Sequence, residues 1–511
     1  MSRACSGVTS YSYMNSGRVT LISSLLLVGV LSGLLYWNSG SRPGPAGRHD
    51  SLLLYCAAGL KPVVEPAVRD YEELTGTRVQ VQYGGSGTLL SNLKVANVGD
   101  LYLAADESFL KTASAERLVA EIIPLARMSP VIAVAKGNPK GLKNLDDLLR
   151  PEVRLVLPNP DAAAVGKVAR AELESDGRWE QLAAHARAFK PTVNDLANDL
   201  KLGSADAVIL WDATARQYPE VEVMPGDFFG DAASEVGVGV LTASKHPQAA
   251  LRFARFLGAP DRGLRHFKPA GFEPVAGDKW VETPELIFYS GGVNRVAIEE
   301  TLRKFEEREG VRINSIYNGC GILTAQIRAG QKPDGYFACD VSFMRTVADK
   351  FKPAVEMAET TMVIATPPGN PRGLRTLAAL AQPGLKIGVA NEKQSALGSL
   401  TARLLREQQL YDSVMANVVV QTPTADLLVN QLRAGGLDAV IVYEANTIAA
   451  GGQIAVVKLD LPGAVAIQPV AINQETEFPR LMERLIEALQ STESITRFTS
   501  NGFRWRGESR P

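Results

Sequence analysis

The sequence predicts two tandem α/β domains of one fold, each divided into two lobes. One observation is an internal repeat, because three marked segments of the first half recur 234 positions later in the second half. The paired positions are Tyr55 and Tyr289, Tyr83 and Tyr317, and Asp106 and Asp340. The other observation is that short apolar strands alternate with amphipathic helices within each half, which is typical of parallel βαβ units. A repeat of this length is a whole domain, since the repeats of solenoids and propellers run to about 20–50 residues.

The elements of the first half follow in order. Strands are predicted at 52–56, 78–83 and 101–104, and helices at 63–75 and 88–96. The first helix has Val64, Val68 and Tyr71 at helical spacing and stops at Gly76. An apolar strand at 129–135 is expected to pass between the lobes, and further βα elements are expected at 154–157, 166–173, 195–202 and 207–211.

Outside the repeats, residues 19–37 form an uncharged apolar segment. It is long enough to cross a hydrocarbon layer of about 30 Å as one helix, and Tyr36 and Trp37 at its end suit a membrane interface. The segment is either an uncleaved anchor or a signal peptide cleaved within 38–47. The predicted organisation is a cytoplasmic N-terminus at 1–18, this segment, a linker at 38–50, and domains at 51–275 and 284–505.

Composition excludes several classes of protein. The 511 residues are 46% hydrophobic and 21% charged, with a formal net charge of −1. This is ordinary globular composition, and it provides no general field for nucleic acid or an anionic membrane surface. The four cysteines and four histidines have no zinc-site spacing. We therefore expect no metal, no cofactor and no nucleic-acid partner.

The turn Gly84-Gly-Ser-Gly87 follows a strand and opens a helix. Its backbone N–H groups have no helical partner and lie at the positive end of the helix dipole. Glycine lets an anion approach the backbone closely, and Ser86 adds a hydroxyl donor without charge. Ala162-Ala-Ala164, in the predicted second lobe, offers a similar turn. Together these turns predict a site for an anion between two lobes.

In their order, Cys56-Ala-Ala-Gly-Leu, Gly84-Gly-Ser-Gly-Thr-Leu and Gly99-Asp-Leu-Tyr-Leu-Ala-Ala-Asp106 resemble the periplasmic molybdate-binding proteins of ABC transporters. Those are type II solute-binding proteins with two lobes around a hinge. The resemblance covers roughly residues 50–275, and more distantly 285–500. It implies two tandem type II periplasmic-binding-protein domains.

The resemblance also implies a site in each domain, in which hydroxyl and backbone donors hold a tetrahedral oxyanion. In domain 1 the implied residues are Ala58, Gly59, Ser86, Gly87, Ala164, Asn194 and Trp211. In domain 2 they are Gly291, Gly292, Cys320, Gly321, Ser395, Ala396, Asp426 and Tyr443. The family usually has serine where Gly59 stands, and Cys320 replaces the serine of the first copy, so the second site is expected to be weaker.

The function implied is extracytoplasmic binding of a small oxyanion such as molybdate or tungstate, with delivery to an ABC permease. The protein would act by lobe closure on the periplasmic side of the cell membrane, anchored by the N-terminal helix or released there. An enzyme on the same fold is disfavoured, because no His, Lys or Cys dyad is common to both copies.

Three alternatives remain open. An iron or other cation could be bound by Tyr443, Glu444, Cys320 and Asp340. The protein could instead be a ligand-sensing envelope protein, or an interaction protein whose clefts have decayed. Cys320 and Cys339 are both expected at the ends of neighbouring strands, either as a disulfide or as free thiols.

Overall fold

The computed structural model describes residues 51–507. The apolar segment predicted at 19–37, and with it the anchor or signal peptide, lies outside these residues. Within the described part, no helix is both long and apolar enough to cross a membrane.

The first copy contains two sheets. The strand order of one is β11 (Glu273–Pro274), β4 (Val119–Met128), β10 (Ser234–Leu241), β3 (Leu101–Ala104), β1 (Leu52–Ala57) and β2 (Val79–Gly84). The order of the other is β7 (Ala188–Lys190), β6 (Leu155–Pro158), β8 (Ala207–Trp211), β5 (Pro130–Ala135) and β9 (Val221–Val223). Both are mixed, because β10 and β5 run antiparallel to their neighbours. Each sheet is the centre of one lobe.

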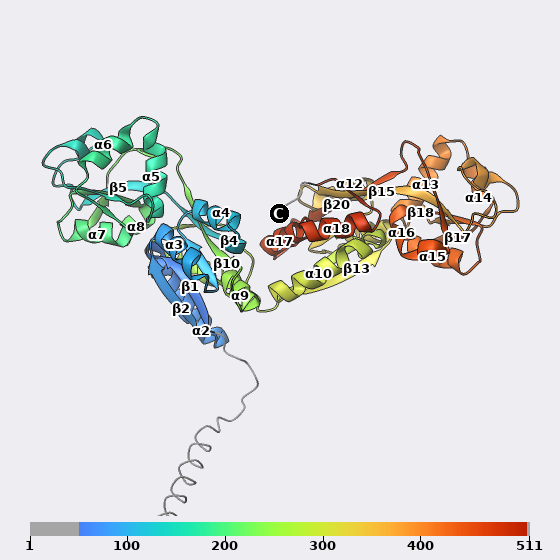
Figure 1. The fold of residues 1–511 in the computed structure, drawn as a ribbon, viewed down its shortest axis with the longest axis horizontal. Helices are drawn as coiled ribbons and strands as arrows, with labels where there is room; N and C mark the ends of the chain where they lie inside the picture. The colour runs from blue at the N-terminus through green and yellow to red at the C-terminus, as the bar shows by residue number, and fades with distance from the viewer. Residues whose placement is uncertain (1–50, 508–511) are drawn as a thin grey trace, which may run out of the picture. The chain divides into compact units, whose positions relative to one another are not determined.

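Helices cover both sheets (Figure 1). The first lobe carries α2 (Lys61–Thr75), α3 (Ser86–Ala96), α4 (Glu107–Ala115) and α9 (Pro247–Leu257). The second lobe carries α5 (Ala164–Glu174), α6 (Arg178–His185), α7 (Val193–Lys201) and the short α8 (Asp212–Arg216). Helix α2 illustrates the local cause: it buries Val64, Val68 and Tyr71, and Gly76 ends it with a φ of 73° that favours glycine.

The second copy repeats this arrangement with one joined sheet. Its strand order is β13 (Arg312–Asn318), β12 (Glu285–Gly291), β14 (Gly335–Phe337), β20 (Val465–Ile472), β15 (Val355–Thr366), β18 (Ala439–Tyr443), β16 (Ile387–Ala390) and β17 (Val418–Thr422). Two further strands, β19 (Ala455–Lys458) and β21 (Arg504–Trp505), pair with β15. The sheet is continuous because β15 runs through the position at which the first copy breaks between β4 and β5.

The helices of the second copy are α10 (Arg295–Glu309), α11 (Cys320–Arg328), α12 (Val341–Arg345), α13 (Ala396–Glu407), α14 (Tyr411–Met415), α15 (Ala425–Arg433), α16 (Glu444–Thr447), α17 (Pro479–Leu489) and α18 (Thr492–Ser500). Strand for strand, β13-β12-β14-β20-β15 matches β2-β1-β3-β10-β4, and β17-β16-β18-β15-β19 matches β7-β6-β8-β5-β9. The tandem α/β fold predicted from the repeat is therefore present.

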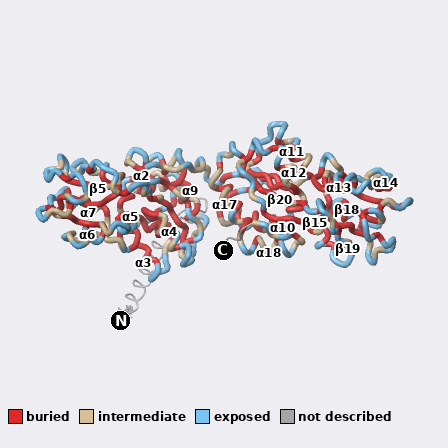
Figure 2. Tube along the Cα trace, turned by 90° about the horizontal axis from the view of Figure 1, so that it is seen from above, coloured by how far each residue is buried: buried red, intermediate tan, exposed pale blue. Residues whose placement is uncertain are grey.

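Buried residues follow the strands and the inner faces of the helices (Figure 2). The carboxyl ends of β1, β3, β6 and β8 are each followed by a turn or a helix N-terminus. Predicted boundaries were close, although α3, α5 and α7 each begin two residues earlier than expected. This shift matters, because the first residues of these helices face the cleft between the lobes.

Candidate functional site

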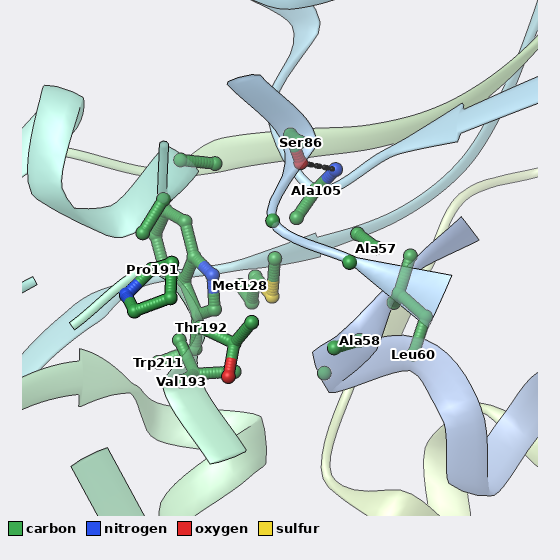
Figure 3. Close-up of a pocket in the computed structure, with 15 residues that line it drawn as sticks. Ala57, Ala58, Leu60, Ser86, Ala105, Met128, Pro191, Thr192, Val193 and Trp211 are labelled. Carbon is green, nitrogen blue, oxygen red and sulfur yellow. Dashed lines mark hydrogen bonds between the residues drawn. The ribbon is translucent and has the colours of Figure 1, made fainter. Parts of the chain in front are cut away.

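A small cavity lies between the two lobes of the first copy (Figure 3). The first lobe contributes Ala57, Ala58, Gly59, Leu60, Gly84, Gly85, Ser86, Ala105 and Met128, and the second contributes Ala163, Ala164, Pro191, Thr192, Val193 and Trp211. The centre of a water molecule can move through ≈ 20 Å³ of this space, which is enough for about one buried water. The two lobes are therefore almost closed on each other.

Three helices begin at the cavity. Helix α3 begins at Ser86, α5 at Ala164 and α7 at Val193, and each of these residues lines it. The first N–H groups of a helix have no acceptor within it. Within residues 51–507, the N–H groups of Ser86, Ala164 and Val193 donate to no backbone carbonyl in a turn, loop or helix cap. The converging dipoles and free donors make a positive but uncharged environment.

None of the fifteen lining residues carries a charged side chain. The carboxylate that follows Trp211 is also accounted for: Asp212 Oδ1 accepts from the N–H groups of Ser129 at 3.0 Å and Ala213 at 2.8 Å. Its charge is therefore satisfied by the backbone at the crossing between lobes. Such a cavity suits an anion held by neutral donors and offers nothing to neutralise a cation.

Ser86 supplies a hydroxyl group to the first-lobe side of the cavity. It is 2% exposed, and its Oγ accepts from the N–H of Ala105 at 3.1 Å (Figure 3). Tyr102 supports the same turn from below, since its hydroxyl donates to the carbonyl of Ser86 at 2.8 Å. Because the Ser86 Oγ is already an acceptor, its own proton remains for a ligand.

Gly87 brings the lobes into direct contact. Its N–H donates to the carbonyl of Ala162, in the other lobe, at 2.9 Å. A Cβ atom at Gly87 would overlap the carbonyl oxygen of Asp161, and it would lie 2.9 Å from the carbonyl carbon and 3.2 Å from Cα of Ala162. Glycine is required here because no side chain fits between the two backbones.

The structure brings together five of the seven residues predicted for the first site, namely Ala58, Gly59, Ser86, Ala164 and Trp211. Gly87 lies at the edge, in the contact between lobes. Asn194 is outside the lining residues, and its Nδ2 donates to the hydroxyl of Tyr218 at 3.2 Å.

Sequence reasoning missed Thr192 and Val193, which line the cavity beside Trp211. Thr192 is the N-cap of α7, and its Oγ1 accepts from the N–H of Asp195 at 3.2 Å. The signal was present, because a Thr three residues before an acidic residue, ahead of an apolar helix, marks an N-terminus. Starting the helix at 195 obscured it.

The surroundings of Gly59 leave little room for a side chain. A Cβ atom at Gly59 would lie 2.8 Å from Cγ2 of Val193. It would also lie 3.4 Å from Oγ1 of Thr214, a buried hydroxyl with no hydrogen-bond partner among the described residues. A side chain at position 59 would therefore force Val193 to shift in the closed form.

The second copy places its predicted residues at the ends of the corresponding elements. They are Gly291 at the end of β12 and Gly292 after it, Cys320 and Gly321 in α11, Ser395 and Ala396 at the start of α13, Asp426 in α15, and Tyr443 at the end of β18. The lobes again touch through backbone, because the N–H of Gly321 donates to the carbonyl of Gln394 at 3.0 Å.

The side chains at these positions of the second copy differ chemically from those that line the first cavity. Asp426 occupies the register position of Asn194, and its Oδ2 would lie 3.9 Å from a Cβ atom at Gly292. Burial raises the pKa of Asp426, although a hydrogen bond from Asn446 opposes that rise. Tyr443 replaces Trp211, and its buried hydroxyl has no partner among the described residues. A carboxylate close to the cleft disfavours an anion there.

Two carboxylates of the alternative cation set are engaged elsewhere. Asp340 Oδ1 accepts from the N–H of Ser342 at 2.9 Å and so caps α12. Glu444 pairs with Lys458 at 2.9 Å. Across residues 51–507, no group of three or more His, Cys, Asp or Glu side chains is arranged to hold a metal ion.

Both copies match the family described as bacterial extracellular solute-binding protein, over residues 52–273 and 286–504. These matches span most of the chain, and the protein belongs to this family. Its class is thus that of the extracellular solute-binding proteins.

A protein from Haemophilus influenzae that carries the name of a binding protein is 32% identical over 225 residues, covering 44% of this chain and 91% of the relative. The molybdate-binding protein ModA of Mycobacterium tuberculosis is 25% identical over 198 residues, covering 38% of this chain and 74% of the relative. Among solved structures, the substrate-binding domain of a molybdenum ABC transporter from Clostridium difficile matches with a TM-score of 0.35 and 21% identity, covering 44% of this chain and 99% of that one.

Proposed function

We propose that the first cleft binds a small, fully ionised tetrahedral oxyanion, of the class that includes molybdate, tungstate and sulfate. The observation that carries this proposal is the meeting of three helix N-termini, α3, α5 and α7, at a cavity without charged side chains. Backbone N–H groups and the Ser86 hydroxyl would donate to the oxygens of the anion. The likeness of the chain to a protein named for molybdate supports this ligand class.

Binding would act through lobe closure. The donors at Ser86 belong to one lobe, and those at Ala164 and Val193 belong to the other. An anion that touches all of them stabilises only the closed form, and it therefore shifts the population toward that form. The hydrogen bond from Gly87 to Ala162 is then a contact of the closed form alone.

The biological role proposed is extracytoplasmic capture of the anion for delivery to an ABC permease. Membership of an extracellular solute-binding family supports the compartment and the role in transport. The apolar segment at 19–37 would hold the binding domains at the membrane surface. The second cleft, with Asp426 and the thiols of Cys320 and Cys339, is assigned no oxyanion in this proposal.

The test is calorimetric titration of the full chain in detergent with molybdate, tungstate, sulfate, phosphate and ferric citrate. We expect one anion site per chain for at least one of the first three ligands. At 100 times its dissociation constant, that ligand should stabilise its domain by about 2.7 kcal/mol, observed as a shift of several degrees in Tm.

Two serines of α3 locate the site. Ser86→Ala removes the hydroxyl at the cavity and should weaken binding about tenfold or more, the effect of one hydrogen bond to a charged group. Ser91→Ala is the matched control, because Ser91 is exposed and bonds only to the carbonyl of Gly87 in its own helix. Equal affinities of the two variants would contradict the proposed site. If a heat of binding is observed with ferric citrate and with none of the anions, the result would favour the cation alternative.

A further inference from the structure

The second copy contains a pair of buried thiols that the first copy lacks. Cys320 is the first residue of α11 and Cys339 follows β14, and the two Sγ atoms are hydrogen-bonded at 2.7 Å. Cys320 is 0% and Cys339 6% exposed. The corresponding residues of the first copy are Ser86 and Ala105. The same backbone hydrogen bond joins each pair, since the N–H of Cys339 donates to Sγ of Cys320 at 3.0 Å as that of Ala105 does to Ser86.

A third position has changed together with this pair. A Cβ atom at Gly291 would overlap Sγ of Cys339 and lie 3.0 Å from Sγ of Cys320. The register counterpart of Gly291 is Ala57, whose methyl group is accommodated beside the smaller Ala105. The second copy therefore has glycine where the two sulfur atoms need room, and the glycine and the thiols form one structural feature.

We infer that Cys320 and Cys339 are a site of reversible oxidation, at which a disulfide forms across the floor of the second cleft. The inference does not depend on the identity of any ligand. It rests on the adjacency of the two sulfurs, on their joint burial, and on the glycine that accommodates them.

The two thiols differ in reactivity. Burial by itself raises the pKa of Cys320, but hydrogen bonding to the side chain and the backbone N–H of Cys339 outweighs it and leaves this pKa below its ordinary value. The hydrogen bond to Cys320 and burial hold the pKa of Cys339 well above its ordinary value. Cys320 is also the first residue of a helix of nine residues, where the helix dipole favours the thiolate form.

The reaction is thiol–disulfide exchange with a small or protein disulfide as oxidant. The Cys320 thiolate attacks one sulfur of the oxidant, and the other sulfur leaves as a thiol after taking a proton. Cys339 then loses its proton and attacks Sγ of Cys320, which releases the second thiol. Two protein thiols and one external disulfide become one protein disulfide and two external thiols. Oxidation removes the S–H donor of Cys320, which occupies the position of Ser86 in the first copy.

The experiment is peptide mapping of the full chain after incubation with oxidised glutathione, both in the folded state and during refolding from urea. Trypsin separates Cys320 and Cys339 into peptides 313–328 and 329–345. We expect these peptides to appear joined, and reductant to separate them. In the unfolded protein, iodoacetamide should label two of the four cysteines before reduction and four after it.

Two variants serve as controls. Cys339→Ala, together with Cys320→Ser, restores the residues of the first copy and should abolish the joined peptide. Cys56→Ser removes the buried thiol of the first copy, which has no sulfur partner, and should leave the joined peptide unchanged. Labelling of all four cysteines after both oxidation routes, or a joined peptide that involves Cys56, would overturn the inference.

Discussion

Replacing Gly87 with alanine should prevent the first domain from closing while leaving it folded. The new Cβ atom would overlap the carbonyl oxygen of Asp161 and lie 2.9 Å from its carbon. Asp161 and Ala162 belong to the other lobe, so opening the cleft relieves the overlap. An ordinary contact is restored when the lobes part by about 1.5 Å.

This displacement has a calculable effect on binding. It lengthens the 2.9 Å hydrogen bond from Gly87 to Ala162 to about 4.4 Å, beyond hydrogen-bonding range. An anion held at Ser86 then loses the donors of α5 and α7. Hydrogen bonds to a charged group contribute about 1.5–3 kcal/mol each. The loss of two of them costs about 3–6 kcal/mol, which is a fall in affinity of about 10²–10⁴.

Calorimetric titration measures the affinity, and a thermal melt without ligand measures the fold. The melting temperature should stay level or rise, because alanine is favoured over glycine in a helix by about 0.5–1 kcal/mol. Gly436→Ala is the control, since the nearest atom to its Cβ would be the carbonyl oxygen of Gln431 at 3.6 Å. If Gly87→Ala binds the anion within about threefold of the parent, the closed form described here is not the ligand-bound form.

Three further predictions concern single sites. Gly59→Ser should weaken anion binding about tenfold through its overlap with Val193, and adding Val193→Ala should restore the affinity; titration of the single and double variants measures both effects. Hydrogen bonds from Arg154 hold the pKa of Asp206 below its usual range, so this carboxylate stabilises the fold above about pH 4 and the stability is lost as pH falls through the lowered value. Asp206→Asn should therefore cost about 1–3 kcal/mol at pH 7 and flatten the decline of unfolding free energy below about pH 4, as measured by urea denaturation. Tyr443→Phe should change stability by less than about 1 kcal/mol, because the buried hydroxyl has no protein partner, and a loss above about 2 kcal/mol would show that it is satisfied by a ligand or water.

The floor of the first cleft was accessible to sequence reasoning because it follows from local rules. Gly59 and Ser86 stand directly after or near the ends of predicted strands, and such ends meet at one edge of a sheet. The same rules placed Ala164 opposite them. The corresponding turns recur in the second copy, at a spacing of 234 for the first lobe and 232 for the second, so the assignment did not depend on any one turn.

Two features were inaccessible for physical reasons. The contact between Gly87 and Asp161 exists only because the lobes are closed. The distance between the lobes depends on the tertiary structure, and no local sequence pattern determines it. Thr192 lines the cavity, whereas Asn194 does not and donates to Tyr218, and with the start of α7 expected two residues too late Thr192 could not be recognised as its N-cap. In the second copy, proximity of Cys320 and Cys339 was foreseeable, but the glycine at 291 that accommodates them emerged only from the three-dimensional arrangement.

The unbroken strand β15 connects the two lobes of the second copy differently from those of the first. In the first copy the sheets of the two lobes are separate, and the chain between β4 and β5 passes through the single residue Ser129. In the second copy β15 pairs with β20 in one lobe and with β18 and β19 in the other. Each copy has a second crossing between its lobes, from β9 to β10 and from β19 to β20, and in the second copy opening must in addition bend the continuous strand β15. We therefore expect the lobes of the second copy to open less far than those of the first, so that two copies of one fold differ in the amplitude of the same motion.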